Sequence, residues 1–240
     1  MCGRFTLTDP DQELAVQFSL AQMPDIPPRY NIAPTQPVAA VRATSEDLAR
    51  EMALLHWGLI PFWAKDPAIG SRMINARSET AAEKPCFRAA FRRRRCLIVA
   101  DGFYEWQKVN GAKQPFYLRL RDGRPFAFAG LWERWEGPEG SVIESCTILT
   151  TQPNELVRPV HNRMPVILAP EDYDLWLDPA LGQGTGHVEQ LQNLLQAYPP
   201  AEMEAYPVSR WVNTPDHDDP RCIEPLADSW YQQVSGRGIS

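Results

Sequence analysis

Residues 96–132 read CLIVADGFYEWQKVNGAKQPFYLRLRDGRPFAFAGLW, and this stretch decides the fold. Its apolar runs are as short as β-strands, and the dipeptides Asn110-Gly111 and Asp122-Gly123 separate them. Such dipeptides between apolar runs are typical of β-hairpin turns. The stretch therefore predicts strands at 96–100, 114–120 and 125–132, with hairpin turns between the runs.

Similar sequence continues on both sides of this stretch. Apolar runs at 37–42, 51–57 and 142–150 predict further strands, and the five prolines of residues 23–37 predict an extended loop. Helical patterns occur at 9–18, 78–94, 152–158, 171–177 and 187–197. Because the strands are joined mostly by turns, we expect an α+β fold: a single domain with a mainly antiparallel, barrel-like β-sheet core and flanking helices.

Length and composition favour one cytoplasmic domain. The chain has 240 residues, of which 44% are hydrophobic, so it is long enough to bury a sizeable core. We expect one domain over 1–230 and a polar C-terminal tail over 231–240. No apolar run approaches the roughly 20 residues of a membrane span, and no signal peptide is visible. We therefore expect no membrane partner, and nothing in the sequence requires more than a monomer.

The cysteines predict free thiols. Their number is odd, and they form neither a CxxC pair nor a zinc-type cluster with histidine. They stand at positions 2, 86, 96, 146 and 222. This pattern fits a reducing compartment, and we expect neither a bound metal nor a cofactor.

The charge argues against a protein that coats nucleic acid without specificity, because the net charge is −6. A local basic groove remains compatible with this total, and 20 of the 24 basic residues are arginine, whose planar group suits phosphate. The run Arg92-Arg93-Arg94-Arg95, with Arg88 one helical turn earlier, has two interpretations. It is either a DNA contact or a solvated, charged helix end, and we favour the second.

Cys2 is the most informative single residue. It follows Met1 in Met-Cys-Gly-Arg-Phe, and a cysteine is small enough for Met1 to be removed. The mature chain would then carry a thiol and a free α-amine on adjacent carbons, with reference pKa values of about 8.5 and about 7.7–8.0. This pair can attack an aldehyde and close a five-membered thiazolidine ring. The alternative is a cysteine at position 2 by chance.

Three other polar clusters lie in apolar or glycine-containing sequence. They are residues 74–80, 100–106 and 160–165, which contain Asn75, Glu105 and His161 respectively. Taken singly, each has a mild explanation. Alternation along a strand would point Glu105 outward, and His161 would be a turn histidine. The residues Ser78 and Glu79 would simply begin a helix.

Taken together, these motifs resemble the SOS response-associated peptidase family, whose members shield abasic sites in single-stranded DNA. The matching motifs are, in chain order, Met-Cys-Gly-Arg-Phe at 1–5, Arg-Tyr-Asn-Ile-Ala-Pro-Thr at 29–35, Trp-Gly-Leu-Ile-Pro-Phe-Trp at 57–63, Asn-Ala-Arg-Ser-Glu-Thr at 75–80, Gly-Phe-Tyr-Glu-Trp at 102–106, Thr150, and His-Asn-Arg-Met-Pro at 161–165. The matches run in order to about residue 211. Seven ordered motifs are highly specific, whereas each alone is weak.

The resemblance implies a covalent reaction at an abasic site. A ring-opened abasic site is an aldehyde, and the N-terminal Cys2 would end in a stable thiazolidine with it. Asn75 would hydrogen-bond the N-terminal group and the opened sugar. Glu105 and His161 would move protons, with their individual steps left open. The activity would be that of a thiol-dependent autopeptidase and DNA-crosslinking protein, with lyase-like Schiff-base chemistry and low turnover.

The resemblance also implies a set of DNA contacts. Phosphates flanking the lesion would meet cations, and exposed aromatic side chains would stack on bases or wedge between them. The implied DNA-binding residues are Arg4, Asn31, Phe62, Trp63, Arg77, Thr150 and Arg163. For Trp57, packing in the core is the favoured interpretation. The expected partner is single-stranded DNA that contains abasic sites, which would associate the protein with the nucleoid.

Two other classes of function are weighed against this one. An N-terminal-nucleophile amidohydrolase of the glutamine amidotransferase type also begins Met-Cys-Gly. Such enzymes typically continue with an aliphatic residue, however, and Arg4 stands there in this chain. A non-covalent module that recognises damaged DNA is the other alternative, and it would not need the Cys2 thiol.

Overall fold

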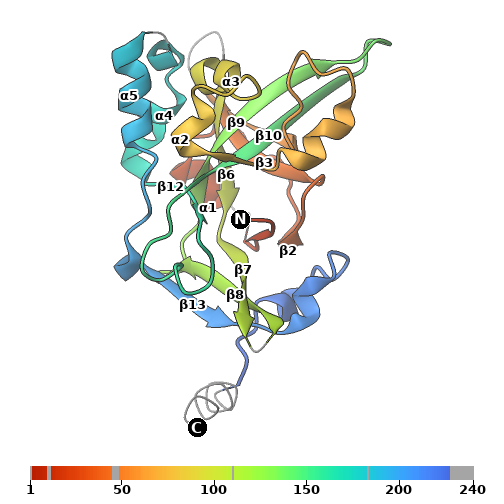
Figure 1. Cartoon of the computed structure of the whole chain (residues 1–240), viewed down its shortest axis with the longest axis vertical. Helices are drawn as coiled ribbons and strands as arrows, with labels where there is room; N and C mark the ends of the chain where they lie inside the picture. Colours follow the sequence, from red (N-terminus) through yellow and green to blue (C-terminus); the bar gives the residue numbers. More distant parts are fainter. Residues whose placement is uncertain (1, 10–11, 45–48, 110, 183, 228–240) are drawn as a thin grey trace.

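The fold is built from two sheets with short helices around them, as the computed structural model shows (Figure 1). The structure describes residues 2–9, 12–44, 49–109, 111–182 and 184–227. The larger sheet and the helices occupy the upper part of Figure 1, and the smaller sheet lies below them. The predicted α+β class with a mainly antiparallel core is confirmed.

Five strands of the larger sheet close into a barrel. They are hydrogen-bonded in the order β10-β4-β3-β6-β9, and pairing between β9 and β10 completes the ring. These strands are β3 (Pro37–Ala43), β4 (Arg50–Trp57), β6 (Arg95–Ala100), β9 (Phe126–Glu136) and β10 (Val142–Thr151). All neighbours are antiparallel except β4 and β10, which run parallel. The predicted barrel-like core is therefore present.

Three short strands extend the barrel at the ends of β9 and β10. They are β5 (Asn75–Arg77), β11 (Met164–Pro165) and β12 (Ile167–Leu168). Both β5 and β11 pair with the last residues of β10, and β12 pairs with β9. Segments that are far apart in the sequence are thereby brought to one end of β10.

The smaller sheet is antiparallel and has the order β13-β8-β7-β1-β2. Its strands are β1 (Phe5–Leu7), β2 (Arg29–Ile32), β7 (Gly102–Val109), β8 (Ala112–Leu120) and β13 (Met203–Pro207). The chain passes from the barrel strand β6 directly into β7 through Asp101. The strand β2 lies inside the proline-rich segment for which only an extended loop was expected.

One of the two predicted hairpins is present, and the other prediction is wrong. The strands β7 and β8 pair up to Val109 and Ala112, as the first turn dipeptide requires, although Asn110 itself lies outside the described residues. Asp122-Gly123 also makes a tight turn, but it carries the chain from β8 to β9 in the other sheet. Both edges of β8 are already taken by β7 and β13, so β9 cannot pair with it.

The helices are short and surround the barrel. They are α1 (Gln12–Gln17), α2 (Ser78–Ala81), α3 (Arg88–Arg93), α4 (Tyr173–Leu177) and α5 (Thr185–Asn193). The 3-10 segments are η1 (Pro67–Arg72), η2 (Pro170–Asp172), η3 (Pro179–Gly182), η4 (Pro200–Glu202), η5 (Arg210–Asn213) and η6 (Pro220–Cys222). The single helix predicted over 78–94 is two helices, because Pro85 disfavours helix at the residue before it. The helix predicted over 152–158 is absent, and turns occupy 155–160.

The arginine run Arg92–Arg95 does not form one solvated face. Arg92 and Arg93 are exposed at the end of α3, whereas Arg95 begins β6 and is only 4% exposed. Its guanidinium donates to the carbonyl oxygens of Phe91 and Trp176, at 2.7 Å and 2.6 Å, and to that of Asp178. The favoured interpretation is therefore wrong for Arg95, which joins β6 to the helices.

Aromatic packing joins the first strand to the barrel core. The ring of Phe5 in β1 lies edge-on to Trp57 and to Phe128, with centroids 5.1 Å and 5.7 Å away. Trp57 is fully buried, as expected for a core residue, and its indole nitrogen donates to the Ile74 carbonyl at 2.9 Å. These contacts fix the start of the chain against the barrel.

Candidate active site

The end of β10 collects three of the predicted site segments. In the parallel pairing with β5, Ile148 lies opposite Asn75 and Thr150 opposite Arg77. On the other side of β10, Thr150 and Thr151 pair with Pro165 and Met164, directly after Arg163. The segments 75–77 and 161–165 are therefore held side by side by one strand.

The pairing of β1 with β7 brings the N-terminal segment to the same region. Phe5 lies opposite Phe103, and the Tyr104 amide donates to the Arg4 carbonyl at 3.0 Å. Continued by two residues, this register places Gly3 opposite Glu105. In Figure 1 the N-terminal segment correspondingly lies in the middle of the molecule, beside β7.

Cys2 is buried and is held by Asn75. The Asn75 amide nitrogen donates to the Cys2 carbonyl oxygen at 2.8 Å, and the Cys2 thiol points to the Arg4 carbonyl at 3.8 Å. Cys2 has no exposed surface. Burial raises the pKa of its thiol above the ordinary value, and the negative charge of Glu105 raises this pKa further. The thiol is therefore neutral at neutral pH.

A cleft of about 450 Å³ opens next to Cys2. It is lined by Gly3, Arg4, Glu105, Trp106, Lys113, His161 and Asn213. The cleft thus contains both predicted proton-transfer residues, Glu105 and His161, within one small volume. Its other basic groups, Arg4 and Lys113, make it suitable for a negatively charged ligand.

Glu105 does not point to solvent, so the outward-facing interpretation is wrong. Its exposed fraction is 3%. Alternation fails to predict this, because β7 is buried on both faces: Phe103 packs on Phe128 of the barrel, and Tyr104 packs on Tyr117. A carboxylate on the barrel side of β7 is therefore buried next to the cleft.

The imidazole of His161 is held by its own loop. The Arg163 amide donates to Nδ1 of His161 at 3.0 Å. The same nitrogen also lies 3.2 Å from the Arg163 carbonyl oxygen. Both contacts come from one residue of the loop, so the loop fixes the orientation of the ring.

Arg163 is largely buried and bound to a carboxylate. It forms a two-point ion pair with Glu79, in which the longer contact is 2.8 Å, and it also donates to the Thr150 carbonyl. The exposed fraction of Arg163 is 9%. Thr150 is fully buried, and its hydroxyl donates to the Ala76 carbonyl at 3.3 Å. The Arg163 guanidinium is thus occupied by Glu79 on one side and by the Thr150 carbonyl on another.

Arg4 and Asn31 form a second buried support. The Arg4 guanidinium donates to the Asn31 side-chain oxygen at 2.7 Å and to the Val212 carbonyl at 2.8 Å. Asn31 is fully buried, and its amide nitrogen donates to the carbonyls of Thr214 and His217 at 3.0 Å and 2.7 Å. Asn31 therefore holds Arg4 at the cleft and does not itself face it.

Arg77 differs from the other two arginines. It is exposed at the start of α2, and no hydrogen bond or ion pair links its guanidinium to the described part of the chain. The Arg77 guanidinium is therefore exposed to solvent and available to bind an anion. Of the three predicted phosphate contacts, Arg77 is the one already open to solvent.

Phe62 and Trp63 lie at the tip of a well-anchored loop. Their exposed fractions are 57% and 48%, which is high for large aromatic side chains. Below the tip, the Ile60 amide donates to the Ser145 hydroxyl at 2.8 Å, and the Trp135 indole donates to the Ala64 carbonyl at 2.7 Å. The loop base is thus fixed to the barrel while its two aromatic rings stay in water.

Some lining residues had no signal in the sequence. Trp106 belongs to a matching motif but had no assigned role, and Lys113 and Asn213 lie in segments without a motif. Only the register of the smaller sheet places Lys113 at the cleft. Glu79 was assigned to a helix start, and its position inside the motif 75–80 was the one available signal for a further role.

No metal centre or membrane helix is found in the described ranges. No group of three or more histidine, cysteine, aspartate or glutamate side chains there is arranged to hold a metal ion. None of the helices described is both long and apolar enough to cross a bilayer. All five cysteines are free thiols.

Fold and site together define a class of protein in which a cysteine at position 2 lies beside a polar cleft that contains a glutamate, a histidine, an arginine and a lysine. This chain belongs to the family described as SOS response associated peptidase (SRAP), whose model matches residues 1–215.

Relatives in bacteria and vertebrates are similar along most of the chain. The abasic site processing protein YoqW of Bacillus subtilis is 45% identical over 228 residues, which cover 93% of this chain and 99% of that protein. The abasic site processing protein HMCES of Xenopus tropicalis is 31% identical, with 82% of this chain and 65% of that protein covered.

Solved structures share the fold. A protein from Bacteroides thetaiotaomicron superposes with a TM-score of 0.82 at 24% identity, over 94% of this chain and 100% of that one. A protein from Bordetella bronchiseptica has a TM-score of 0.73 at 30% identity, over 87% of this chain and 100% of the other. Both solved structures therefore share the overall fold of this chain.

Proposed function

We propose that this protein captures abasic sites in single-stranded DNA by a covalent bond to Cys2. One observation carries the proposal: Asn75 holds the backbone of Cys2 by a 2.8 Å hydrogen bond beside a cleft that contains Glu105 and His161. The names of the relatives in Bacillus and Xenopus, both abasic site processing proteins, support the same substrate. Removal of Met1, by a methionine aminopeptidase or by the protein itself, gives Cys2 its free α-amine.

The first step uses the amine and not the thiol. A primary amine forms an imine with an aldehyde, and the reference pKa of an α-amine, about 7.7–8.0, leaves part of it unprotonated at neutral pH. It attacks C1′ of the ring-opened abasic site, and the carbonyl oxygen leaves as water after taking up two protons. The product is a Schiff base between Cys2 and the DNA.

The second step closes the ring. The Cys2 sulfur adds to the carbon of the Schiff base, and the thiol proton passes to the nitrogen, so that no further atom is lost. The product is a thiazolidine whose total mass is that of protein plus DNA minus one water. A five-membered ring with both heteroatoms on one residue explains why an N-terminal cysteine is needed.

Glu105 and His161 move the protons of these steps. Glu105 takes a proton from the α-ammonium and returns protons as the Schiff base forms. His161 donates a proton to the sugar oxygen as the ring opens, with its imidazole held in place by Arg163. This chemistry is lyase-like, and the stable product makes turnover low.

The DNA strand runs across the cleft between cations and aromatic rings. Arg77 binds a phosphate next to the lesion directly, and Arg163 does so when its bond to Glu79 is exchanged for a phosphate. Arg4, supported by Asn31, binds on the other side of Cys2. Phe62 and Trp63 stack on or between the neighbouring bases, and a single protein molecule suffices for all these contacts.

Intact-mass spectrometry tests the proposal. The purified protein, mixed with a single-stranded oligonucleotide that carries one abasic site, should lack Met1 and form a species at protein plus oligonucleotide minus water. The variant Cys2→Ala keeps a small residue at position 2 and hence the free amine. It should form only a reversible Schiff base that borohydride traps. A stable adduct at the wild-type rate in Cys2→Ala would refute the mechanism.

The same spectra separate the alternatives. Loss of Met1 without any adduct would favour an amidohydrolase or a non-covalent binding module. Retention of Met1 would remove the free aminothiol and with it the whole mechanism.

A further inference from the structure

A groove beside Phe62 lies outside the cleft described above. Its volume is about 770 Å³. It is lined by Phe62, Arg88, Ala89, Arg92, Arg93, Arg94, Trp132, Glu133 and Arg134. We refer to it as the α3 groove, because three of its five arginines lie in α3 and a fourth, Arg94, directly follows that helix. None of the proposed chemistry at Cys2 uses it.

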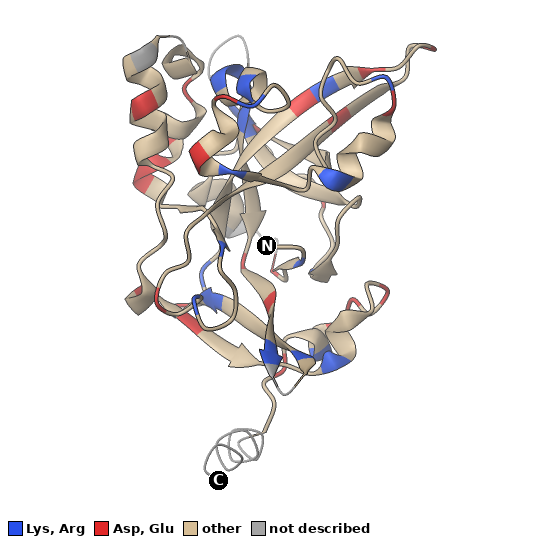
Figure 2. Ribbon diagram, viewed as in Figure 1, with Lys and Arg blue, Asp and Glu red and all other residues tan. Residues whose placement is uncertain are grey.

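The α3 groove carries unbalanced positive charge. Two of its arginines are neutralised, Arg94 by Glu133 at 2.6 Å and Arg134 by Glu136. The remaining three, Arg88, Arg92 and Arg93, are exposed and form no ion pair with any described residue. The whole chain has a net charge of −6, so three arginines without an ion-pair partner on one short helix make this surface locally positive. In Figure 2 the helix α3 is largely blue, whereas α5 beside it carries red segments.

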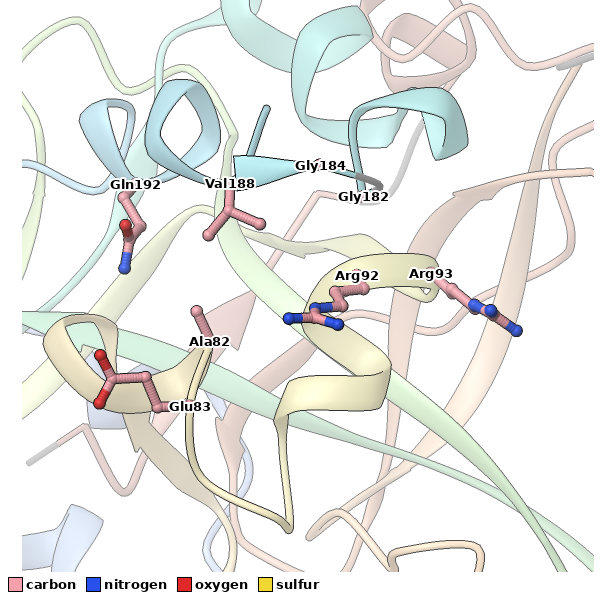
Figure 3. Close-up of a pocket in the computed structure, with 8 residues that line it drawn as sticks. All are labelled: Ala82, Glu83, Arg92, Arg93, Gly182, Gly184, Val188 and Gln192. Atoms are coloured by element: carbon pink, nitrogen blue, oxygen red, sulfur yellow. The ribbon is translucent and has the colours of Figure 1, made fainter. Parts of the chain in front are cut away.

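Two of these arginines, Arg92 and Arg93, also line a neighbouring cavity. This cavity has a volume of about 610 Å³ and lies between α3 and α5 (Figure 3). Glu83 is the one acidic residue among its described lining, and Figure 3 shows its carboxylate on the far side of Ala82 from Arg92. The two guanidinium groups extend from α3 in different directions, so together they present charge over a wide surface.

The helix that carries these cations is firmly placed. Arg95, two residues beyond its end, is bonded to three backbone carbonyls. On the opposite side, Gly182 packs so closely that a Cβ there would lie 1.4 Å from the Arg92 carbonyl oxygen. A rigid support holds the arginines in place, so less entropy is lost when a ligand binds.

Cations and aromatic rings on one face are the combination that binds single-stranded nucleic acid. Arginine contacts the phosphates, and an aromatic ring stacks on a base without regard to sequence. The groove has both, because the exposed ring of Phe62 forms one wall of it and the unpaired arginines another. Phe62 also belongs to the loop proposed to contact bases near the lesion, so the groove continues the same path.

We propose that the α3 groove binds the sugar–phosphate backbone of the single strand several nucleotides away from the abasic site. This inference rests on the proposed function, because it extends the DNA path from Phe62 to Arg88, Arg92 and Arg93. It assigns to the arginine run a role that the chemistry at Cys2 does not require. The groove binds the phosphates of single-stranded DNA whatever its base sequence, and it does not take part in the crosslinking step.

The test compares oligonucleotides of two lengths. The variant carries Arg88→Gln, Arg92→Gln and Arg93→Gln, and affinity is measured in a Cys2→Ala background so that binding is separated from bond formation. One abasic oligonucleotide has about 4 nucleotides and the other about 16, the two ends of the range that such a site covers. On the long DNA, the slope of log affinity against log salt should become shallower by about 2. Each phosphate contact on a single strand contributes about 0.7 to this slope, and the variant loses three such contacts.

Binding of the short DNA should not change, since it ends before the groove. The matched control replaces Arg119, Arg121 and Arg124 by glutamine, which removes the same charge from β8 and the turn after it. Phe62→Ala should weaken binding of the long DNA without changing its salt slope, because stacking releases no counterions.

Several results would overturn the proposal. They are an unchanged salt slope in the groove variant, an equal loss on both DNA lengths, or an equal loss in the control. Covalent capture is scored separately, with Cys2 intact and the short DNA. If the wild type forms no adduct there, the proposed function fails. If the adduct forms but the slope on long DNA does not change, only the groove fails.

Discussion

At the scale of single residues, Asn75 connects the fold to the chemistry. Its side-chain nitrogen donates a hydrogen bond to the Cys2 carbonyl oxygen. Its side-chain oxygen is buried and has no hydrogen-bond partner among the described residues. A buried acceptor without a partner costs about 1–3 kcal/mol. In the proposed reaction, that oxygen accepts a hydrogen from the Cys2 α-amine or from a sugar hydroxyl, so ligand binding satisfies it.

The substitution Asn75→Ala tests this role. It removes the contact with the Cys2 carbonyl and the acceptor for the substrate, and one such hydrogen bond of about 1.4 kcal/mol corresponds to about a 10-fold rate change. We expect adduct formation, followed on denaturing gels, to slow by at least this factor. The melting temperature should stay within a few degrees of the wild type, because loss of the hydrogen bond to Cys2 is partly offset by removal of a buried oxygen that has no partner among the described residues. A normal rate would show that Asn75 only packs against the N-terminal segment.

The ion pair between Glu79 and Arg163 makes a prediction about pH. Arg163 lowers the pKa of the Glu79 carboxyl below its ordinary value by hydrogen bonding. A group with a lowered folded-state pKa stabilises the fold above its unfolded pKa, about 4.3 for glutamate, and loses this contribution as the pH falls through the folded value. The stabilisation is therefore present at neutral pH and is lost in acid.

The variant Glu79→Gln should accordingly melt lower than the wild type at pH 7, by about 2–4 °C for a loss of about 1 kcal/mol. The difference should shrink as the pH is lowered below about 4, where the wild-type carboxyl takes up its proton. Thermal unfolding followed by circular dichroism across this range measures it. A constant difference at every pH would mean that the charge of Glu79 is not responsible.

At the scale of elements, the loop from Gly58 to Arg72 sets the position of the aromatic tip. Its two ends approach so closely that a Cβ on Gly58 would lie 2.6 Å from the Gly70 carbonyl oxygen. Gly58 also has a φ of +139°, a backbone conformation that residues other than glycine rarely adopt. The loop closure therefore requires glycine there.

We expect Gly58→Ala to separate the loop ends and shift Phe62 and Trp63. Binding of abasic DNA should weaken, and quenching of tryptophan fluorescence by the DNA should diminish. The control is Gly140→Ala, where φ is +77° and nothing lies within 4 Å of the added Cβ. It introduces backbone strain, of about 1–3 kcal/mol, without a collision. Equal effects of both substitutions on DNA binding would argue against a role for the loop closure.

Individual elements also show what the sequence could and could not predict. The barrel strands followed from short apolar runs, and the site segments followed from contiguous motifs such as residues 75–80. The burial of Glu105 did not, because alternation assumes that one face of a strand meets water, and β7 is covered on both. The role of Glu79 depends on Arg163, 84 residues later, and no local pattern contains such a contact.

At the scale of the whole molecule, barrel closure fixes the site, because β10 belongs to the ring and also carries β5 and β11. Gly130 lies inside the ring, where an added Cβ would meet the Cys96 sulfur at 2.8 Å and Ile98 side-chain carbons at 2.9 Å. Overpacking of such a position costs about 1–3 kcal/mol. The barrel interior is thus filled at the point where β6 and β9 pair.

The substitution Gly130→Val should therefore lower the melting temperature by about 2–12 °C, because it costs about 1–3 kcal/mol and each kcal/mol corresponds to about 2–4 °C. Adduct formation below the transition should remain close to normal, because Gly130 contacts no residue of the cleft. Thermal unfolding and denaturing gels measure the two effects. Gly186→Ala, in α5 with nothing within 4 Å of the added Cβ and no positive φ, is the control for loss of a glycine as such.

The pairing of β1 with β7 has a consequence for how the molecule is made. Thr6 bonds to Asp101 across 95 residues of sequence, so β1 can pair only after β7 has left the ribosome. Asn75 is likewise made before β10, the strand that holds it in place. The segment that is made first therefore takes up its position only when strands made much later have joined it.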